Sequence, residues 1–496
     1  MSASLPPASD VPQPASADVG DPSTAGLEAV SGAELPRRDF LRIASAGTGA
    51  LLAGAALTPA SLDAQPQPPR GIRRRFGRAS GHVVVVGAGA WGAFTAYHLR
   101  QQGVKVTLVD QYGIANSRAT SGDETRGIRS SYGDRTVTAD LWVRWARRSI
   151  ERWRQFDAEH GKRFGTRFFY TTGDVIIREK PEPFTTRTAE LWTAQGVPFE
   201  ALTADEARRR WPQFVSEGSQ VVLYEPDAGV ARARDSVQAV GALARDAGVE
   251  FKLGRIRPGA VTAGKMEALT FDDGSTLAAD AYVFCCGPWF PKLFPSLMQT
   301  RMRIPMGHVC YFGTPEGDTR FQFPNIPSWN VPGVTGWPSH PIDNRGFRVR
   351  GAFAPPAPPR AADDDAPPPP APVAPDPRLQ DPDLSPRWSS QERIDGSRRV
   401  LQKHFPALAD APIVETRSCH YESSVNRNFI VDRLPGADNA WIAGVGQAEG
   451  FKFSIVMGEY VASRVLGEPG DAVIAEAFRL PTAEYDPNAP SRWEEE

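Results

Sequence analysis

The chain has 496 residues, of which 23% are charged and 41% hydrophobic, and its 56 basic and 58 acidic side chains give a net charge of −2. This length is enough for two or three domains, and the near-neutral charge argues against a nucleic-acid-binding protein, because binding a phosphate backbone requires a basic surface. Four cysteines in a chain of this size exclude a scaffold built on disulfides.

The N-terminal part of the sequence predicts an export signal. Residues 1–36 are rich in Pro, Ala, Ser, Asp and Gly and are expected to form a disordered extension. Arg37-Arg38-Asp39-Phe40-Leu41-Arg42 then precedes a weakly hydrophobic run, so residues 37–64 have the outline of a twin-arginine signal. An arginine pair before an ordinary buried helix is the alternative. We expect a periplasmic or secreted protein that uses the twin-arginine export machinery, with the signal either cleaved or kept as an anchor.

A basic linker is expected over residues 65–80. The alternative is a patch that binds nucleic acid or anionic lipid, but the position between the signal and the first strand favours a solvated linker. Its arginines are Arg70, Arg73, Arg74, Arg75 and Arg78.

The first folded segment carries a glycine fingerprint. A β-branched run, His82 to Val86, predicts a parallel strand buried on both faces, and it opens directly into Gly87-Ala88-Gly89-Ala90-Trp91-Gly92. Gly87 permits the tight turn, Gly89 lets the backbone approach a pyrophosphate, and Gly92 lets the following helix pack against the strand. The motif indicates a dinucleotide site, with a glycine turn that has no ligand as the alternative.

The residues after the fingerprint favour the dinucleotide site. A helix is expected over about Trp91 to Gln102, followed by a second strand from Val104 to Val109. That strand delivers Asp110, whose carboxylate can accept hydrogen bonds from the ribose hydroxyls of an adenosine. The fingerprint by itself does not separate NAD from FAD.

Two later segments supply further pieces of the same kind of fold. The expected strand Ala281 to Cys286 breaks at Gly287-Pro288-Trp289, as strands do where they end over a cofactor. Near the C-terminus, Gly444-Val445-Gly446 and Gly450-Phe451-Lys452-Phe453 precede a helix expected over about residues 454–466. A helix N-terminus behind a glycine-rich turn suits an anion. Pieces this far apart in the sequence imply a discontinuous cofactor domain with a second domain inserted.

These motifs together resemble a known family. From His82 to about Gly467 the chain resembles the glycine/D-amino-acid oxidase (DAO) superfamily of FAD-dependent enzymes, and most of all its sarcosine oxidase and N-methyltryptophan oxidase branch. Besides the fingerprint and Asp110, the resemblance rests on Gly122-Asp123-Glu124-Thr125-Arg126-Gly127-Ile128-Arg129 with Tyr132-Gly133, Glu225-Pro226-Asp227-Ala228-Gly229-Val230, Gly287-Pro288-Trp289, Cys419-His420-Tyr421, Phe429-Ile430-Val431-Asp432 and Gly450-Phe451-Lys452-Phe453.

The resemblance implies both a fold and an activity. The fold class is α/β, with a discontinuous Rossmann-like FAD-binding domain and a mostly antiparallel substrate domain. The enzyme would oxidise the C–N bond of an amine or N-substituted amino acid by hydride transfer to FAD, and water would hydrolyse the imine. Oxygen is the expected acceptor, with a periplasmic electron acceptor as the alternative. The expected FAD-binding segments are 81–165, 228–292 and 424–480, and the substrate-domain segments are 166–227 and 293–423.

The resemblance also assigns roles to single residues. Arg129 and Lys452 would hold a substrate carboxylate, Arg126 would lie against the flavin ring and stabilise its reduced form, and Tyr421 would line the substrate cavity. Cys419 matches a cysteine that forms a thioether to the 8α-methyl group of FAD, which implies a covalent cofactor, with an ordinary buried thiol as the alternative. The residues expected to bind the cofactor are Gly87, Gly89, Gly92, Asp110, Arg126, Gly287, Trp289, Cys419, Gly446, Gly450, Phe451 and Lys452.

Three positions depart from the family's pattern. Arg348 stands where the family carries a lysine over the flavin that assists the reaction with oxygen. Glu449 replaces a histidine, and Thr335 replaces a pocket tyrosine. A carboxylate at 449, beside the carboxylate-binding cations, is expected to repel a small amino acid or to attract a more basic substrate. Sarcosine itself is therefore not the expected substrate.

Two further functions stay open, and so does the role of one insert. The first alternative is a flavin dehydrogenase that acts on a hydroxy acid or a cyclic imino acid and uses an acceptor other than oxygen. The second is a flavin-binding subunit without catalytic activity. Residues 354–386 are expected to form a solvated proline-rich loop, with a lid or a partner-binding segment as the alternative. No Cys/His spacing suggests a metal site.

Overall fold

The glycine fingerprint lies in a sheet of six strands. All described residues fall within one unit, residues 62–496. The predicted signal, the basic linker and most of the proline-rich insert lie outside the described residues. The computed structural model describes residues 81–135, 138–338, 340–355, 381–468 and 470–485. The strands are, in spatial order, β23 (Ile430–Leu434), β24 (Ala437–Gly444), β15 (Ala281–Phe284), β1 (His82–Val86), β2 (Lys105–Asp110) and β9 (Glu250–Leu253).

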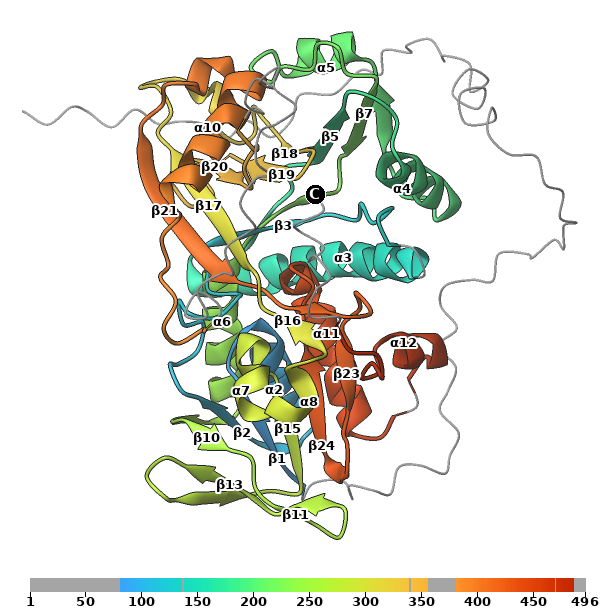
Figure 1. The fold of residues 1–496 in the computed structure, drawn as a ribbon, viewed down its shortest axis with the longest axis vertical. Coiled ribbons are helices and arrows are strands. Elements are labelled where there is room, and N and C mark those ends of the chain that lie inside the picture. The colour runs from blue at the N-terminus through green and yellow to red at the C-terminus, as the bar shows by residue number, and fades with distance from the viewer. Residues whose placement is uncertain (1–80, 136–137, 339, 356–380, 469, 486–496) are drawn as a thin grey trace, which may run out of the picture. The chain divides into compact units, whose positions relative to one another are not determined.

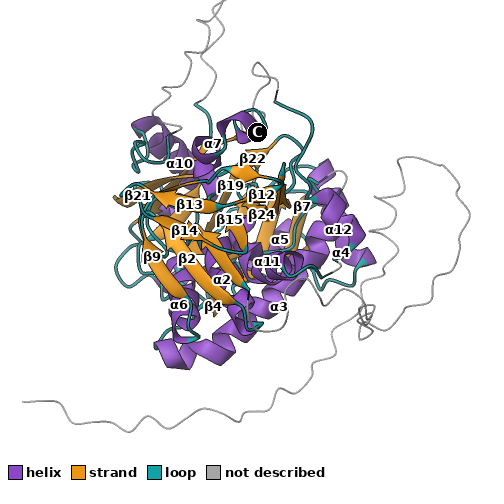
Figure 2. Cartoon of the chain, turned by 90° about the horizontal axis from the view of Figure 1, so that it is seen from below, coloured by secondary structure: helices purple, strands orange, loops and turns teal. Residues whose placement is uncertain are grey.

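Strand β1 is buried on both faces, as its run of valines predicts. Val83 and Val85 pack with helices on one face, whereas Val84 and Val86 join the apolar cluster on the other face. Figure 2 shows the helices gathered on the first face, namely α2 (Ala90–Gln101), α3 (Ala139–Phe164), α6 (Ala233–Asp246) and α11 (Gly450–Val465). The other face is covered by β10 (Ile256–Arg257), β13 (Ala268–Phe271), β14 (Thr276–Ala278), α7 (Phe290–Leu293) and α8 (Pro295–Met298).

A second sheet has eight strands and is mostly antiparallel. Every neighbouring pair in it is antiparallel except β18 and β5, which run parallel. Its own apolar core forms beneath α10 (Gln391–His404). The strands are, in spatial order, β21 (Ile413–His420), β17 (Met306–Phe312), β20 (Phe347–Arg350), β19 (Val334–Trp337), β18 (Ser328–Val331), β5 (Asp174–Arg178), β7 (Val221–Glu225) and β6 (Glu200–Leu202).

The two large sheets confirm the predicted α/β fold class with a mostly antiparallel second sheet. In Figure 1 they lie at opposite ends of the described residues, with α3 and a small sheet between them. That small sheet contains β3 (Thr125–Ile128), β8 (Gly229–Arg232) and β4 (Phe169–Tyr170). The exact domain boundaries stay a prediction.

The remaining elements are short or peripheral. None of the described helices is long and apolar enough to span a membrane. These elements are α4 (Pro183–Ala194), α5 (Ala204–Arg210), β11 (Val261–Thr262), β12 (Lys265–Met266), η1 (Gly287–Trp289), β16 (Met302–Arg303), η2 (Thr319–Phe321), η3 (Pro406–Leu408), β22 (Ser423–Ser424) and α12 (Ala472–Ala477).

The predicted start of the C-terminal helix is wrong by about one turn. The helix α11 begins at Gly450, not at residue 454, so Lys452 lies in its first turn. The chain turns sharply just before it, because Val445, Gln447 and Ala448 all adopt the left-handed backbone conformation. Such strain in residues other than glycine is held in place by surrounding contacts and is concentrated at functional sites. This turn borders both cavities described below.

Candidate active site

The larger cavity lies at the carboxyl edge of the six-stranded sheet and has a volume of about 660 Å³. The turns that follow β1, β2, β15 and β24 contribute to its wall, which is where ligands bind on parallel sheets. Its lining includes most of the residues predicted to bind the cofactor: Gly87, Gly89, Asp110, Arg126, Gly287, Trp289, Gly446, Gly450 and Phe451.

The glycine fingerprint positions backbone at the cavity. Gly87 has a φ of +99°, and a Cβ there would lie 2.3 Å from the carbonyl oxygen of Cys285, so no larger residue fits. Gly89 lines the cavity with its backbone. Gly92 does not line the cavity, and its assignment to the cofactor-binding residues stays a prediction. A Cβ at Gly92 would lie 1.8 Å from the carbonyl oxygen of Gly87, so its role is to let α2 approach the turn.

Asp110 is fixed at the end of β2 by backbone donors. Its Oδ2 accepts a hydrogen bond from the N–H of Ala88 at 2.7 Å, and its Oδ1 accepts from the N–H groups of Tyr112 and Gly113 at 2.7 and 2.9 Å. Burial raises the pKa of Asp110, while these three donors oppose the shift. The carboxylate therefore has a set position where the ribose of a bound dinucleotide lies.

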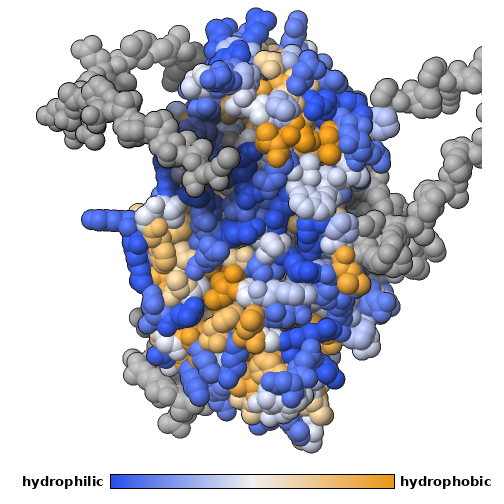
Figure 3. Space-filling model, turned by 90° about the vertical axis from the view of Figure 1, so that its left-hand side faces the viewer, coloured by the Kyte–Doolittle hydropathy of each residue, from blue (hydrophilic) through white to orange (hydrophobic). Residues whose placement is uncertain are grey.

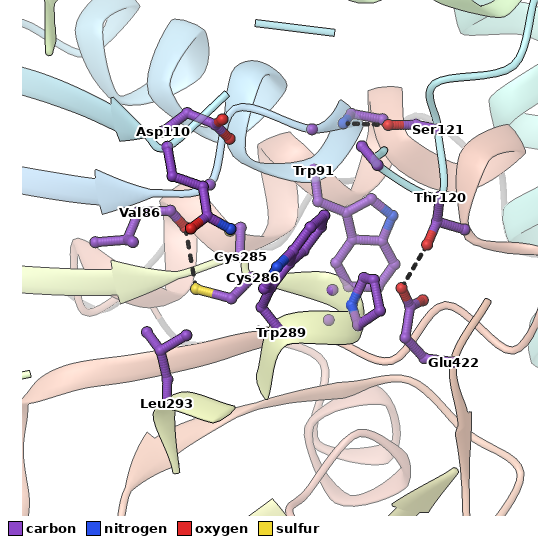
Figure 4. Close-up of a pocket in the computed structure, with 18 of the residues that line it drawn as sticks. Val86, Trp91, Asp110, Thr120, Ser121, Cys285, Cys286, Trp289, Leu293 and Glu422 are labelled. Carbon is purple, nitrogen blue, oxygen red and sulfur yellow. Dashed lines mark hydrogen bonds between the residues drawn. The ribbon is translucent and has the colours of Figure 1, made fainter. Parts of the chain in front are cut away.

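Glu422 is a buried acid of the cavity wall that the motifs did not identify. It is 4% exposed and accepts a hydrogen bond from the Thr120 hydroxyl at 2.7 Å (Figure 4). It accepts another from the N–H of Gly446 at 3.1 Å. Burial raises the pKa of its carboxyl group. Glu422 thus joins the segment before β3 to the turn before α11, and its position three residues after Cys419 is the only signal the sequence offered.

A smaller cavity adjoins the larger one and shares Arg126 and Phe451 with it. The face that carries β21, seen in Figure 3, is hollowed near its middle, where hydrophilic residues predominate. The smaller cavity brings together the residues predicted for catalysis, the three positions that depart from the family, and the cysteine predicted to hold the cofactor. These residues are Arg126, Arg129, Thr335, Arg348, Cys419, Tyr421, Glu449 and Lys452.

Asp123 holds the cations at one side of the smaller cavity. It is fully buried, forms ion pairs with Arg126 and with Arg348 (3.1 Å), and lies 3.8 Å from Arg417. Burial alone raises the pKa of Asp123, but the three arginines outweigh it and hold the pKa far below its usual range. Arg348 also stacks 3.8 Å from the ring centroid of Trp337, and its Nε and Nη1 atoms have no hydrogen-bond partner within the described part of the chain.

Lys452 already has an anionic partner. Its ammonium group is 3% exposed, forms an ion pair with Glu449 and donates a hydrogen bond to the Tyr132 hydroxyl at 2.6 Å. Burial lowers the pKa of Lys452 to about 8, although Glu449 opposes the shift. Burial alone raises the pKa of Glu449, but Lys452 and Arg129 hold it far below its ordinary value. The structure therefore gives Lys452 an internal carboxylate where the sequence predicted a substrate carboxylate.

Arg129 is a further cation of the smaller cavity. Its guanidinium lines the cavity, and among the described residues it has no hydrogen bond or ion pair. Burial lowers its pKa, but nearby acids, with Asp174 the strongest, more than offset this effect. A planar guanidinium with free donors suits bidentate binding of a carboxylate.

Cys419 lies on β21 at the wall of the smaller cavity. Its Sγ is 3.8 Å from the Nη2 atom of Arg126, and Arg126 lines both cavities. Of the residues predicted to bind the cofactor, Cys419 and Lys452 line only the smaller cavity. The thiol is thus beside the boundary between the two cavities.

Behind Arg129, two buried acids face each other across β5 and β7. Asp174 is the register partner of Glu225, and burial raises their pKa values to about 6 and about 7. Glu225 accepts hydrogen bonds from the N–H and the hydroxyl of Ser130. Because both carboxyl groups ionise at a lower pH in the unfolded chain, their ionisation lowers the free energy of unfolding as the pH rises from about 4 through 7.

We expect Glu225→Gln to stabilise the protein at alkaline pH. At pH 8 the free energy of unfolding should exceed that of the parent by on the order of 2 kcal/mol, because the variant no longer carries a buried charge there. Below pH 4.5 the two proteins should be equally stable, since both side chains are neutral. Urea denaturation across pH 4.5 to 8 measures this difference, and parallel pH profiles for parent and variant would contradict it.

The chain was compared with known proteins. A family model described as DAO, FAD dependent oxidoreductase, matches residues 82–464. Monomeric sarcosine oxidase of Bacillus sp. (strain B-0618) is 25% identical over 394 residues, which cover 77% of this chain and 92% of that relative. N-methyl-L-tryptophan oxidase of Yersinia pestis (strain Pestoides F) is 22% identical over 405 residues, covering 80% and 98%.

Solved structures show the same fold. Fructosyl peptide oxidase from E. terrenum superposes with a TM-score of 0.67 at 20% identity and covers 82% of this chain and 94% of its own. Iminodiacetate oxidase from Chelativorans sp. BNC1 gives a TM-score of 0.61 at 18% identity, covering 80% and 98%. At these identities the likeness extends to the fold alone.

Proposed function

The chain belongs to the DAO family of FAD-dependent oxidoreductases, and from this membership we propose that it oxidises the C–N bond of an amine or N-substituted amino acid. The observation that carries the proposal is the cationic smaller cavity, which adjoins the dinucleotide cavity and contains Arg129 with free donors. Two relatives are named as oxidases of sarcosine and of N-methyl-L-tryptophan, which supports this class of substrate.

The residues of the larger cavity fit FAD. Gly87 and Gly89 expose backbone where a diphosphate must approach, and Asp110 is fixed where a ribose lies. Gly446 and Gly450 border the cavity at the start of α11, where helix N–H groups favour an anion. When bound, FAD supplies the acceptor for the hydride equivalent.

The residues of the smaller cavity position the substrate. Arg129 binds the carboxylate of an amino-acid substrate and so orients the C–N bond. Arg126, fixed by Asp123, presents positive charge where the two cavities meet. Tyr421 closes the wall of the substrate site. The oxidised substrate leaves as an imine, which water hydrolyses to a carbonyl compound and an amine.

The proposal predicts that an anaerobic protein loses its oxidised-flavin absorbance when a substrate amine is added. A panel of N-methyl, cyclic and primary amines, each with and without a carboxylate, identifies the substrate class. In Arg129→Met the KM of a carboxylate-bearing substrate should rise at least a hundredfold, because a charge-assisted pair worth about 3 kcal/mol is lost. The KM of an amine without a carboxylate should change little. A flavin that no amine reduces, or an unchanged KM in the variant, would refute the proposal.

Covalent attachment of FAD through Cys419 is part of the proposal. The thiol lies beside Arg126, at the boundary of the cavities, which supports a bond to the edge of the flavin ring. In the parent, the yellow colour should remain with the polypeptide after acid precipitation. In Cys419→Ala it should pass entirely into the supernatant, whereas a Cys310→Ala control should behave like the parent. Colour that stays with the Cys419→Ala polypeptide would rule out this link.

Oxygen is the acceptor we propose, and a dehydrogenase that uses another acceptor is the second candidate. Arg348 favours the second candidate, because its guanidinium, held by the ion pair with Asp123 and stacked on Trp337, stands where the family carries a lysine that assists the reaction with oxygen. Return of the flavin colour within seconds of admitting air would identify an oxidase. Recovery only with an artificial acceptor would identify a dehydrogenase.

Export through the twin-arginine pathway is also part of the proposal. Arg37 and Arg38 before a short apolar run support it, and this route carries folded proteins that already hold a cofactor. Replacing both arginines with lysine should retain the protein in the cytoplasm, as fractionation would measure.

A further inference from the structure

A loop that precedes α10 is bonded to residues in the wall of the larger cavity. Residues 381–389 include the end of the proline-rich insert, 354–386, and contain no helix or strand. At one end the loop is tied to β21, because Ser418 donates its N–H to the carbonyl of Arg387 at 2.9 Å. The hydroxyl of Ser385 also lies 2.6 Å from the ring nitrogen of His420. The loop is therefore anchored beside Cys419.

At its other end the loop bridges two walls of the cavity through one carboxylate. Oδ1 of Asp383 accepts hydrogen bonds from the Tyr112 hydroxyl at 2.6 Å and from Nε1 of Trp289 at 2.7 Å. Tyr112 and Trp289 both line the cavity, and their ring centroids are 5.9 Å apart. Tyr112 follows β2, whereas Trp289 follows β15, so Asp383 joins segments that the sheet alone leaves unconnected.

Charge pairing holds the same carboxylate. Lys292, also in the cavity wall, forms ion pairs with Asp383 and with Asp381 at 2.7 Å. Arg118 donates to the backbone carbonyl of Asp383, and its guanidinium lies over the Tyr112 ring at 4.9 Å. Two cations therefore balance the two aspartates, so the loop brings no net negative charge to the edge of a site for an anionic diphosphate.

The clamped residues lie at the nucleoside end of the dinucleotide site. Asp110, which marks the ribose position, accepts the backbone N–H of Tyr112 at 2.7 Å. Tyr112 and Trp289, the two aromatic residues that Asp383 connects, line the cavity at this end. We propose that Asp383 clamps the adenosine end of bound FAD, so that the loop 381–389 limits exchange of the cofactor. This inference depends on FAD binding and not on the oxidation of an amine.

The test measures release of FAD from the full-length protein in a Cys419→Ser background, where no thioether can hold it. Release is followed by the rise of flavin fluorescence after dilution. Asp383→Ala should release FAD at least ten times faster than the background protein. Asp383→Asn keeps an acceptor for Tyr112 and Trp289 but loses the charge, so its rate should lie between the two. Asp318→Ala is the matched control, because its carboxylate pairs with Arg320 and lines neither cavity.

Two results would overturn the clamp. One is a release rate in Asp383→Ala within twofold of the background, even if the variant melts at a lower temperature, because that aspartate would then only stabilise the fold. The other is an unchanged release rate in Tyr112→Phe. This variant removes one hydroxyl and keeps the ring, so it serves as the test if Asp383→Ala does not fold. If the protein proves to hold FAD without a covalent bond, the Cys419 proposal fails, and the same rates are measured without that substitution.

Discussion

Asp123→Ala is expected to lower the free energy of unfolding by about 3–5 kcal/mol, which is a large part of the stability of a typical domain. The carboxylate is fully buried and is shared by Arg126, Arg348 and Arg417. Removing it leaves at least two of these cations in the interior without a compensating negative charge. The Nε and Nη1 atoms of Arg348 are already unsatisfied among the described residues, so the loss of Asp123 adds to the unmet hydrogen bonds of that side chain.

Urea denaturation measures this loss, and two further variants define its origin. Asp123→Asn keeps hydrogen-bond acceptance but not the charge, so it should destabilise the protein nearly as much as alanine does. Asp246→Ala breaks the exposed ion pair with Arg163 and should change the free energy of unfolding by no more than about 1 kcal/mol. An asparagine variant as stable as the parent would show that the charge of Asp123 does not hold the three arginines.

The parts of the fold that the sequence predicted correctly are local in sequence. The strand His82–Val86, its glycine turn and Asp110 form one continuous unit, and each residue type there has a steric or hydrogen-bonding reason that neighbouring residues reveal. The second, mostly antiparallel sheet was predicted from the family resemblance that the ordered motifs carry. The start of α11 was missed because three residues other than glycine adopt a left-handed backbone, which their sequence does not signal.

The contacts that define the site were not predictable, because they join residues that are far apart in the chain. Tyr132 and Lys452 are separated by 320 positions, Thr120 and Glu422 by 302, and no pattern in either segment indicates its partner. The pair of Glu449 and Lys452 is different. The two residues are three positions apart at the start of α11, a spacing that brings side chains together on a helix, but the helix was predicted to begin only at residue 454. The sequence placed Glu449 beside the cations, but only the structure shows that it neutralises one of them.

That neutralisation leads to the second large effect, which concerns Glu449→Gln. This variant is expected to bind acetate, a minimal carboxylate ligand, ten to a hundred times more tightly than the parent at pH 6.5. In the parent, the Glu449 carboxylate forms the ion pair with Lys452 and lies close enough to Arg129 to affect the pKa of both groups. Removing this negative charge relieves a repulsion of up to about 4 kcal/mol between carboxylates about 4 Å apart.

The pH dependence of this binding follows from Lys452. Burial lowers its pKa to about 8, and Glu449 is the group that opposes this shift, so the glutamine variant should have a pKa below 8. An anion binds the protonated ammonium, and its affinity should therefore fall as the pH rises through that value. Asp174 and Glu225, with pKa values of about 6 and about 7, also lose protons in this range, and their negative charge weakens anion binding in the same direction. The variant is therefore compared with the parent at each pH. Arg129 and Arg135 stay charged, and the pKa of Tyr132 is raised well above its usual value.

Changes in flavin absorbance during an acetate titration measure this affinity at each pH. Glu459→Gln is the matched control, because Glu459 lies on the same helix, pairs with Arg148 and Arg152, and lines neither cavity. Its acetate affinity should equal that of the parent. If Glu449→Gln binds acetate no better, or equally well at pH 6.5 and pH 9, then Glu449 does not compete with ligand for Lys452. If the affinity for acetate does rise, the KM of small N-methyl amino acids should fall in Glu449→Gln, because their carboxylate competes with Glu449 for a cation. The KM of amines without a carboxylate should stay constant.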